Sequence, residues 1–139
     1  HNGENLMSIR YIGTSPPAAA VAADFTTLTT NTAVAATQVN AAATGNLTLD
    51  FSANQNFILT LTGALTLDNP TTEIVGQSGF IVFIQDGTGG RTVSLGTDYE
   101  TVGAAGLTLS SAASTTDIVP YVTMADARIL LGAPQLAFA

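Results

Sequence analysis

Apolar and polar positions alternate with a period of two along much of the chain, the pattern of β-strands that bury one face. The alternation is clearest in residues 47–51, where Leu47, Leu49 and Phe51 are separated by polar residues. Further segments of this kind are predicted at 57–62, 65–67, 107–109, 117–122 and 128–131. Short strands with turn signals at spacings of about 8–12 residues are typical of a β-sandwich.

Residues 76–95 predict a β-hairpin. Residues 80–84 (FIVFI) form a wholly apolar run rich in β-branched and aromatic side chains, which favours a strand buried on both faces. Residues 86–90 (DGTGG) supply three glycines for the turn, and residues 91–95 return with alternating polarity.

The predicted fold class is all-β: an antiparallel β-sandwich, jelly-roll-like, preceded by an extended N-terminal arm. The sandwich domain spans residues 46–139, and its apolar C-terminal tail at 134–139 is expected to dock rather than hang free. Pro120 has no amide hydrogen to donate, so its strand is expected at an edge or bulged there. The expected core includes Phe51, Phe57, Leu59, Leu61, Phe80, Val82, Ile84, Val119 and Ile129.

The N-terminal third differs from the rest of the chain in amino-acid composition. Residues 1–6 precede Met7 and are interpreted as a non-native or processed leader. Residues 7–45 are rich in Ala and Thr and too poor in large apolar side chains to build a core, so they are expected to form an extended arm that gains order on a partner. The sizeable side chains of this arm, and therefore its expected partner-binding anchors, are Tyr11, Ile12, Phe25 and Leu28.

Charge narrows the range of partners. The 139 residues carry a net charge of −7, with three arginines and no lysine. Binding to nucleic acid needs several clustered basic residues, so a nucleic-acid partner is excluded, and an anionic membrane would repel the chain. Charged residues make up only 9% of the chain, against about a quarter in typical domains. This low fraction indicates that neighbouring molecules cover much of the surface.

Candidate chemistry is sparse. The single histidine is His1, so no Ser-His-Asp arrangement can form within the β-domain. The glycines at 87–90 resemble a phosphate loop only superficially, because a P-loop needs a lysine and a following helix. Asp98 and Glu100, with Asp86 across the turn, could supply oxygen ligands to Ca²⁺, but such groups are more often solvated loops. The expectation is no enzyme, no cofactor and no metal.

A family resemblance adds to this picture. Residues 76–79 (GQSG) with 85–93 (QDGTGGRTV) resemble a β-module that recurs in virion proteins of tailed bacteriophages. Residues 107–109, 116–119 and 127–129 are similar to the ending of the same module, so the resemblance covers residues 46–131. In that family the module occurs both in capsid decoration or cement proteins and in tail fibres. It therefore implies a non-catalytic structural protein of the virion, made in the host cytoplasm.

Two functions stay open, with a free carbohydrate-binding module as a remoter third. The favoured one is a decoration protein on the outer surface of the capsid, with the major capsid protein as partner and the arm as its fastener. The alternative is a tail fibre that recognises host surface glycans. The resemblance also implies a homotrimer. Copy number separates the two functions, because hundreds of copies per particle indicate decoration and a handful indicate a fibre.

Overall fold

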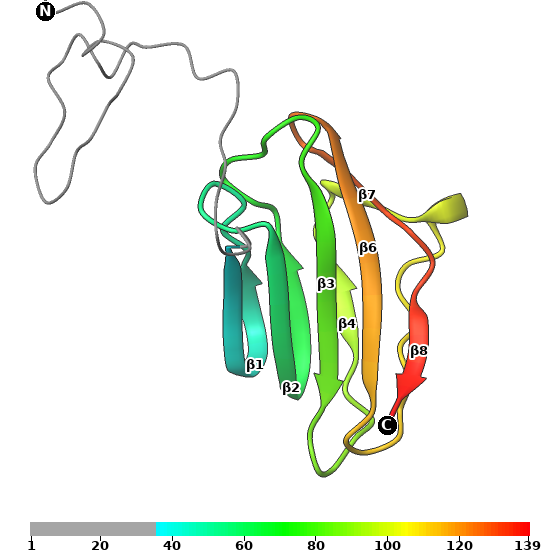
Figure 1. Cartoon of the computed structure of the whole chain (residues 1–139). Coiled ribbons are helices and arrows are strands. Elements are labelled where there is room, and N and C mark those ends of the chain that lie inside the picture. Colours follow the sequence, from blue (N-terminus) through cyan, green and yellow to red (C-terminus); the bar gives the residue numbers. More distant parts are fainter. Residues whose placement is uncertain (1–35) are drawn as a thin grey trace, which may run out of the picture. The chain divides into compact units, whose positions relative to one another are not determined.

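The computed structural model describes residues 36–139, which contain eight β-strands and no α-helix. A 3₁₀ turn, η2 (Val102–Ala104), lies between the fifth and sixth strands (Figure 1). No helix among these residues is long and apolar enough to cross a membrane. The strands are β1 (Thr37–Thr48), β2 (Asn56–Asp68), β3 (Ser78–Gln85), β4 (Val93–Leu95), β5 (Tyr99–Glu100), β6 (Thr116–Ala125), β7 (Arg128–Leu131) and β8 (Gln135–Phe138).

All eight strands belong to one mixed sheet. Its order is β1-β2-β3-β6-β7-β5, and β4 pairs with β2 while β8 pairs with β6. β2 pairs in parallel with β1, β3 and β4, whereas β6 pairs antiparallel with β3, β7 and β8. The all-β class is therefore confirmed. The expected antiparallel sandwich is wrong, because β5 also pairs in parallel with β7, so that four of the seven ladders run parallel.

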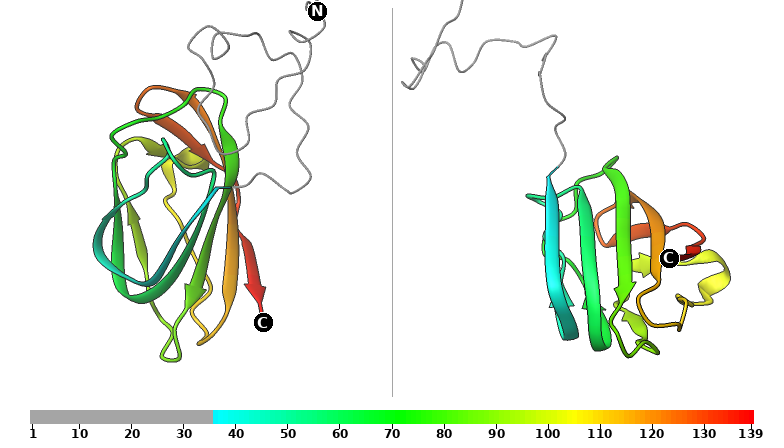
Figure 2. Two further views of the ribbon diagram at one scale, coloured as in Figure 1. Left: turned by 60° about the vertical axis from the view of Figure 1, so that its left-hand side comes forward. Right: turned by 60° about the horizontal axis from the view of Figure 1, so that its bottom comes forward.

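The sheet curls so strongly that the first halves of β1 and β2 face their second halves across the core (Figure 2). β1 and β2 each bend round in a U (Figure 2, left), and the backbone NH of Asp50 just beyond β1 donates to Oε1 of Gln38 near its start, at 3.0 Å. In β2 the bend falls at Gly63, where an added Cβ would collide with the Thr44 side chain of the neighbouring strand. The first flank of the curled sheet comprises residues 37–40, 57–61 and 81–85 with β6 and β8, and the second comprises 45–48, 65–68 and 93–95.

The predicted hairpin at residues 76–95 is wrong in its pairing. β3 and β4 do not pair with each other; β3 continues the first flank beside β2 and β4 continues the second. The buried side chain of Gln85 explains the difference. Its Oε1 accepts a hydrogen bond from the Arg91 NH at 2.9 Å and its Nε2 donates to the Arg91 carbonyl at 2.9 Å. The amide side chain thus takes the backbone groups that a returning hairpin strand would pair.

The core lies between the two flanks. Phe57, Leu59 and Leu61 from the first flank are fully buried, as are Leu65 and Leu67 from the second. Of the expected core, Phe51, Phe57, Leu59, Leu61, Val119 and Ile129 are confirmed as buried. Phe51 packs against Phe57 with the rings tilted by 49° and their centroids 4.7 Å apart, and it meets Tyr121 edge-on at 5.2 Å.

Phe80, Val82 and Ile84 are not in the core. Phe80 is 51% exposed, and Val82 and Ile84 are half-buried. The partners in the same strand, Ile81 and Phe83, are buried. Because side chains alternate across a strand, β3 buries one face only, although its residues are apolar on both.

The ends of the domain also differ in part from expectation. β1 begins at Thr37, inside the range predicted for the arm, and residues 1–35 with the four predicted anchors Tyr11, Ile12, Phe25 and Leu28 lie outside the described residues. The C-terminal tail docks, since β8 pairs with β6. Pro120 is not on an edge strand; it falls between the part of β6 paired with β7 and the part paired with β8, where no strand requires its missing NH.

Candidate functional site

The three carboxylates considered for a cation do not come together. Asp86 pairs with Arg91 at 2.8 Å, and Glu100 pairs with Arg128 at 2.8 Å, each carboxylate occupied by its own arginine. Within residues 36–139 no group of three or more Asp, Glu, His or Cys side chains is arranged to hold a metal ion.

Asp86 organises the turn between β3 and β4. Its Oδ1 accepts hydrogen bonds from the backbone NH groups of Thr88 and Gly89 at 3.0 and 2.9 Å, and its Oδ2 accepts from Nη2 of Arg91 at 2.8 Å. All these bonds favour the ionised carboxylate, and the bond from Arg91 has the largest effect. Together they lower the pKa of Asp86 from 3.8 to about 2. The carboxylate is thus a structural element of the turn.

We expect this turn to make the domain sensitive to acid. Because the fold favours ionised Asp86, the unfolded chain binds more protons between pH 3.8 and about 2. The contribution of Asp86 is therefore complete above this window and is lost as the pH falls through it. Thermal unfolding followed by circular dichroism should show that Asp86→Asn lowers the melting temperature at pH 7 and weakens its fall below pH 4. An Asp86→Asn profile parallel to that of the unchanged protein throughout would contradict this role.

The buried side chain of Asp117 on β6 connects the loop before β6 with the C-terminal strand β8. This buried carboxylate accepts hydrogen bonds from the NH and the hydroxyl of Ser110, at 2.6 and 2.8 Å, and from the Ala137 NH at 2.8 Å. The arrangement places a serine beside a carboxylate, but with no histidine or lysine among the described residues it lacks a base to activate the hydroxyl. Its role is to anchor the loop before β6 and the C-terminal strand.

A hollow of about 580 Å³, lined by both polar and apolar residues, lies beside β5. It is lined by Leu95, Thr97, Tyr99, Glu100, Thr101, Ala104 and Gly106. The Glu100–Arg128 pair at its side is bidentate, with a second contact of 3.2 Å from Nη2 to Oε2, and the two side chains are 42% and 51% exposed. Thr101 Oγ1 accepts a bond from the Gly106 NH at 2.9 Å, which leaves its own hydrogen free to donate.

This hollow offers hydrogen bonds rather than a stacking platform. Arg128 has donors and Glu100 has acceptor lone pairs beyond those used in the pair, and both reach solvent. The one aromatic lining residue, Tyr99, is only 6% exposed, and its burial raises the pKa of the phenol. Such a set of neighbouring donors and acceptors fits the vicinal hydroxyls of a sugar, and it lacks a nucleophile.

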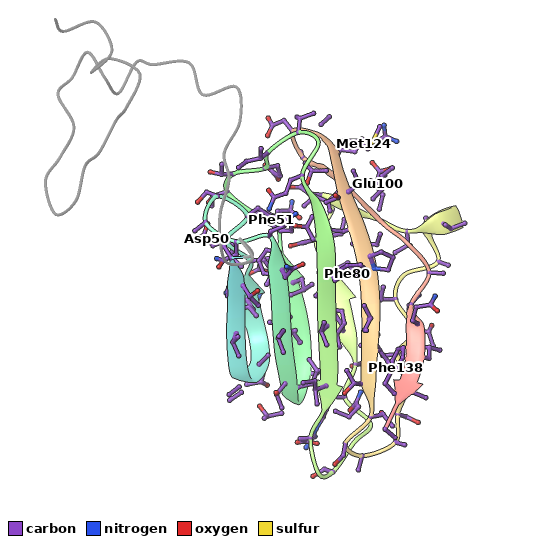
Figure 3. All side chains as sticks on the ribbon, viewed as in Figure 1. Asp50, Phe51, Phe80, Glu100, Met124 and Phe138 are labelled. Atoms are coloured by element: carbon purple, nitrogen blue, oxygen red, sulfur yellow. The ribbon has the colours of Figure 1, made fainter. Side chains whose placement is uncertain are left out.

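The outer side of the first flank is apolar. Phe80 on β3 and Phe138 on β8 are each 51% exposed and Val39 on β1 is 66% exposed (Figure 3 shows the first two). Between them lie half-buried aliphatic side chains of β2, β3 and β6. We call this surface the apolar face; it consists of Val39, Ile58, Phe80, Val82, Ile84, Ile118, Pro120, Val122 and Phe138 with Thr37, Asn56, Thr60, Ser78 and Thr116.

Sequence reasoning missed both surfaces. Glu100 was considered as a cation ligand, and its pairing with Arg128, 28 residues later, depends on the parallel contact of β5 with β7. The apolar face did leave a signal, because a run apolar at every position, such as residues 80–84, must present apolar side chains to both sides of a sheet. It was interpreted as burial within the domain.

The chain matches one family of known proteins. A family model described as "Putative phage tail fibre C-terminal domain" matches residues 43–125, more than half of the chain. No curated protein and no solved structure matches the chain. The match confirms the predicted resemblance to a phage virion β-module.

Proposed function

The chain belongs to the phage tail fibre C-terminal domain family, and from this premise we propose that it is a non-catalytic fibre domain that binds host surface glycans at the hollow beside β5. The family match carries the fibre part of the proposal. The chemistry of the Glu100–Arg128 pair beside the hollow supports the glycan part.

The fibre alternative replaces capsid decoration as the better-supported reading. The matched family is one of tail fibres, and nothing in it points to the outer surface of the capsid or to the major capsid protein as partner. The chain is a structural component of the phage virion. A receptor-binding fibre would contact the host surface, and the described residues offer a hollow of about 580 Å³ with hydrogen-bonding groups for such a contact.

Copy number tests the fibre assignment independently of any ligand. Quantitative mass spectrometry of purified particles, with a virion protein of known copy number as standard, is expected to give a handful of copies per particle. Hundreds of copies would restore the decoration hypothesis.

Glycan binding is tested at the ion pair. The full chain on a glycan array is expected to bind a limited set of sugars, and Arg128→Ala is expected to weaken the signal about tenfold or more, since a charge-assisted hydrogen bond contributes about 1.5–3 kcal/mol. Arg91→Ala is the matched control, because it removes the same charge from a pair that does not line the hollow. An array with no hits, or equal loss in both variants, would contradict a site at the hollow.

A further inference from the structure

The loop between β2 and β3 (residues 69–77) lies against the end of β6. The Gly76 NH donates to the Thr123 carbonyl at 2.9 Å, and the Thr123 NH donates to the Gln77 carbonyl at 2.8 Å. The turn between β6 and β7, which contains Asp126, lies at the same end of the domain (Figure 1). Backbone hydrogen bonds therefore hold one end of the loop close to this turn.

Three carboxyl groups meet where the loop reaches the turn. The carboxyl of Glu73 in the loop hydrogen-bonds with those of Asp126 in the turn and of Asp98. Asp98 directly precedes β5, and its carbonyl accepts a hydrogen bond from the Ile129 NH of β7 at 2.7 Å. Bonds among the three side chains thus connect the loop with two other segments of the chain.

These bonds require a proton. Ionised carboxylates accept hydrogen bonds and cannot donate them, so two of them bond only when one carries a hydrogen. Oε1 of Glu73 is buried and has no hydrogen-bond donor beside it, so an ionised Glu73 would be uncompensated there. Both arginines of residues 36–139 pair elsewhere, with Asp86 and with Glu100, and the same residues hold no group arranged for a metal ion. A proton is therefore the positive charge that suits this cluster.

The phenol of Tyr99 faces the cluster from the interior. Tyr99 is 6% exposed, and its hydroxyl is buried without a hydrogen-bond partner. Burial raises the pKa of the phenol, and the charges of Asp98, Glu73 and Asp68 raise it further, so its hydroxyl lies close to these carboxylates. A neutral phenol supplies a hydrogen-bond donor but no positive charge. Its unpartnered hydroxyl distinguishes the cluster from a solvated acidic surface.

We propose that Glu73, Asp98 and Asp126 form a carboxyl clamp, closed by a shared proton, that fixes the loop of residues 69–77 to the segment before β5 and to the β6–β7 turn. Acid closes the clamp, because a protonated Glu73 donates to a neighbouring carboxylate. A rise in pH opens it, because three ionised carboxylates without a basic partner repel one another.

The direction of the pH dependence is the reverse of that at Asp86. Burial raises the pKa of Glu73 above its usual 4.5, and the charges and hydrogen bonds of Asp126 and Asp98 raise it further. Because the folded chain holds this proton more tightly than the unfolded chain, the contribution of the clamp is complete below pH 4.5 and is lost as the pH rises through the raised pKa. The contribution of Asp86 is lost as the pH falls below 3.8, so the two pH windows do not overlap.

The clamp is connected to the hollow beside β5. Asn69, at the start of the loop, donates from Nδ2 to Thr97 Oγ1 at 2.8 Å and accepts at Oδ1 from the Asp98 NH at 3.1 Å. Thr97 lines the hollow. Opening of the clamp is therefore expected to loosen one wall of the hollow, although the clamp itself needs no ligand.

Amide hydrogen exchange of the full chain, followed by NMR from about pH 4 to 8, tests the proposal. After correction for the intrinsic exchange rate at each pH, protection of the Gly76 NH is expected to fall severalfold as the pH rises. The Gln85 NH, bonded to the Thr115 carbonyl at 2.8 Å at the other end of β3, is the internal reference and should keep its protection. Glu73→Gln stays neutral and can donate at every pH, so it should keep Gly76 protected throughout.

Asp50→Asn is the matched control. It also removes one carboxylate, but Asp50 is not among the groups that shift the pKa of Glu73, so the pH dependence at Gly76 should remain. A flat Gly76 profile in the unchanged protein would overturn the proposal. So would a Glu73→Gln profile that falls like that of the unchanged protein, or loss of the dependence in Asp50→Asn.

An NMR titration of the Glu73 carboxyl in the unchanged protein covers the case in which Glu73→Gln does not fold. A titration midpoint above 4.5 is expected, and a midpoint at or below 4.5 would overturn the clamp. Both measurements are made without a glycan, so failure of the clamp would leave the glycan proposal standing.

Discussion

Replacing Phe83 by aspartate is expected to unfold the β-domain. Phe83 is 2% exposed and lies within β3, paired with Leu59 on one side and Asp117 on the other. Loss of a buried phenylalanine ring alone costs about 3–5 kcal/mol, and a carboxylate in its place would be buried without a basic partner. Since the stability of a domain this size is about 5–15 kcal/mol, the variant should lose most or all of its folded population.

Phe80→Asp is the control for this change. It makes the same substitution three residues away in the same strand, but Phe80 points outward and is 51% exposed. Far-UV circular dichroism and thermal unfolding should show a folded Phe80→Asp domain and an unfolded Phe83→Asp chain. Cooperative unfolding of Phe83→Asp near the temperature of the unchanged protein would mean that β3 does not bury this side chain.

The hydrophobic pattern predicted the segments of β2, β3, β4, β6 and β7 and most of their inward residues. It missed β1, β5 and β8, and the strand predicted at 107–109 and most of the one predicted at 47–51 are not strands. Alternation over residues 47–51 and 57–62 identified Phe51, Phe57, Leu59 and Leu61, and each of them is buried. Period-two alternation depends only on local backbone geometry, so it can be recognised without knowing which strands are neighbours. The same property explains why Val119 and Ile129 were predicted correctly from short segments.

Strand pairing could not be predicted this way. The local sequence of residues 80–95 is compatible with a hairpin, in which the two strands pair with each other, and with an arch, in which they pair with different parts of β2. Both need an apolar strand, a glycine-rich turn and a second strand. The choice depends on β2, which is long enough to pair with β3 through residues 57–61 and with β4 through residues 65–67. It also depends on Gln85, whose side chain bonds Arg91 and the Ser110 carbonyl. A glutamine in a strand gives no sign of these partners in the sequence.

The candidate site was still less predictable. Arg128 and Glu100 meet because β5 pairs with β7, and Asp86 and Glu100 pair with different arginines. Ion pairs between distant segments leave no periodic signal. The absence of histidine after His1, by contrast, is read directly from the sequence, and it excludes a Ser-His-Asp triad within the β-domain.

Gly89→Ala is expected to be among the most destabilising small substitutions in the turn between β3 and β4. Gly89 has φ of 73°, which costs a residue with a Cβ about 1–2 kcal/mol. An added Cβ would also lie 2.8 Å from the backbone nitrogen of Ala113, and it would overlap the Ser111 carbonyl oxygen. Both obstacles are backbone atoms of the loop before β6, so this loop would have to move as a whole.

Gly90→Ala separates the two causes. Gly90 has nearly the same φ, 72°, but nothing lies within 4 Å of an added Cβ. Gly90→Ala should therefore cost only the conformational strain of about 1–2 kcal/mol. Gly89→Ala should cost this and the overpacking of the loop, for a total of roughly 2–5 kcal/mol. Chemical denaturation of both variants measures the difference. Equal losses would mean that the loop before β6 yields freely, and that the turn does not depend on close contact with residues 111–113.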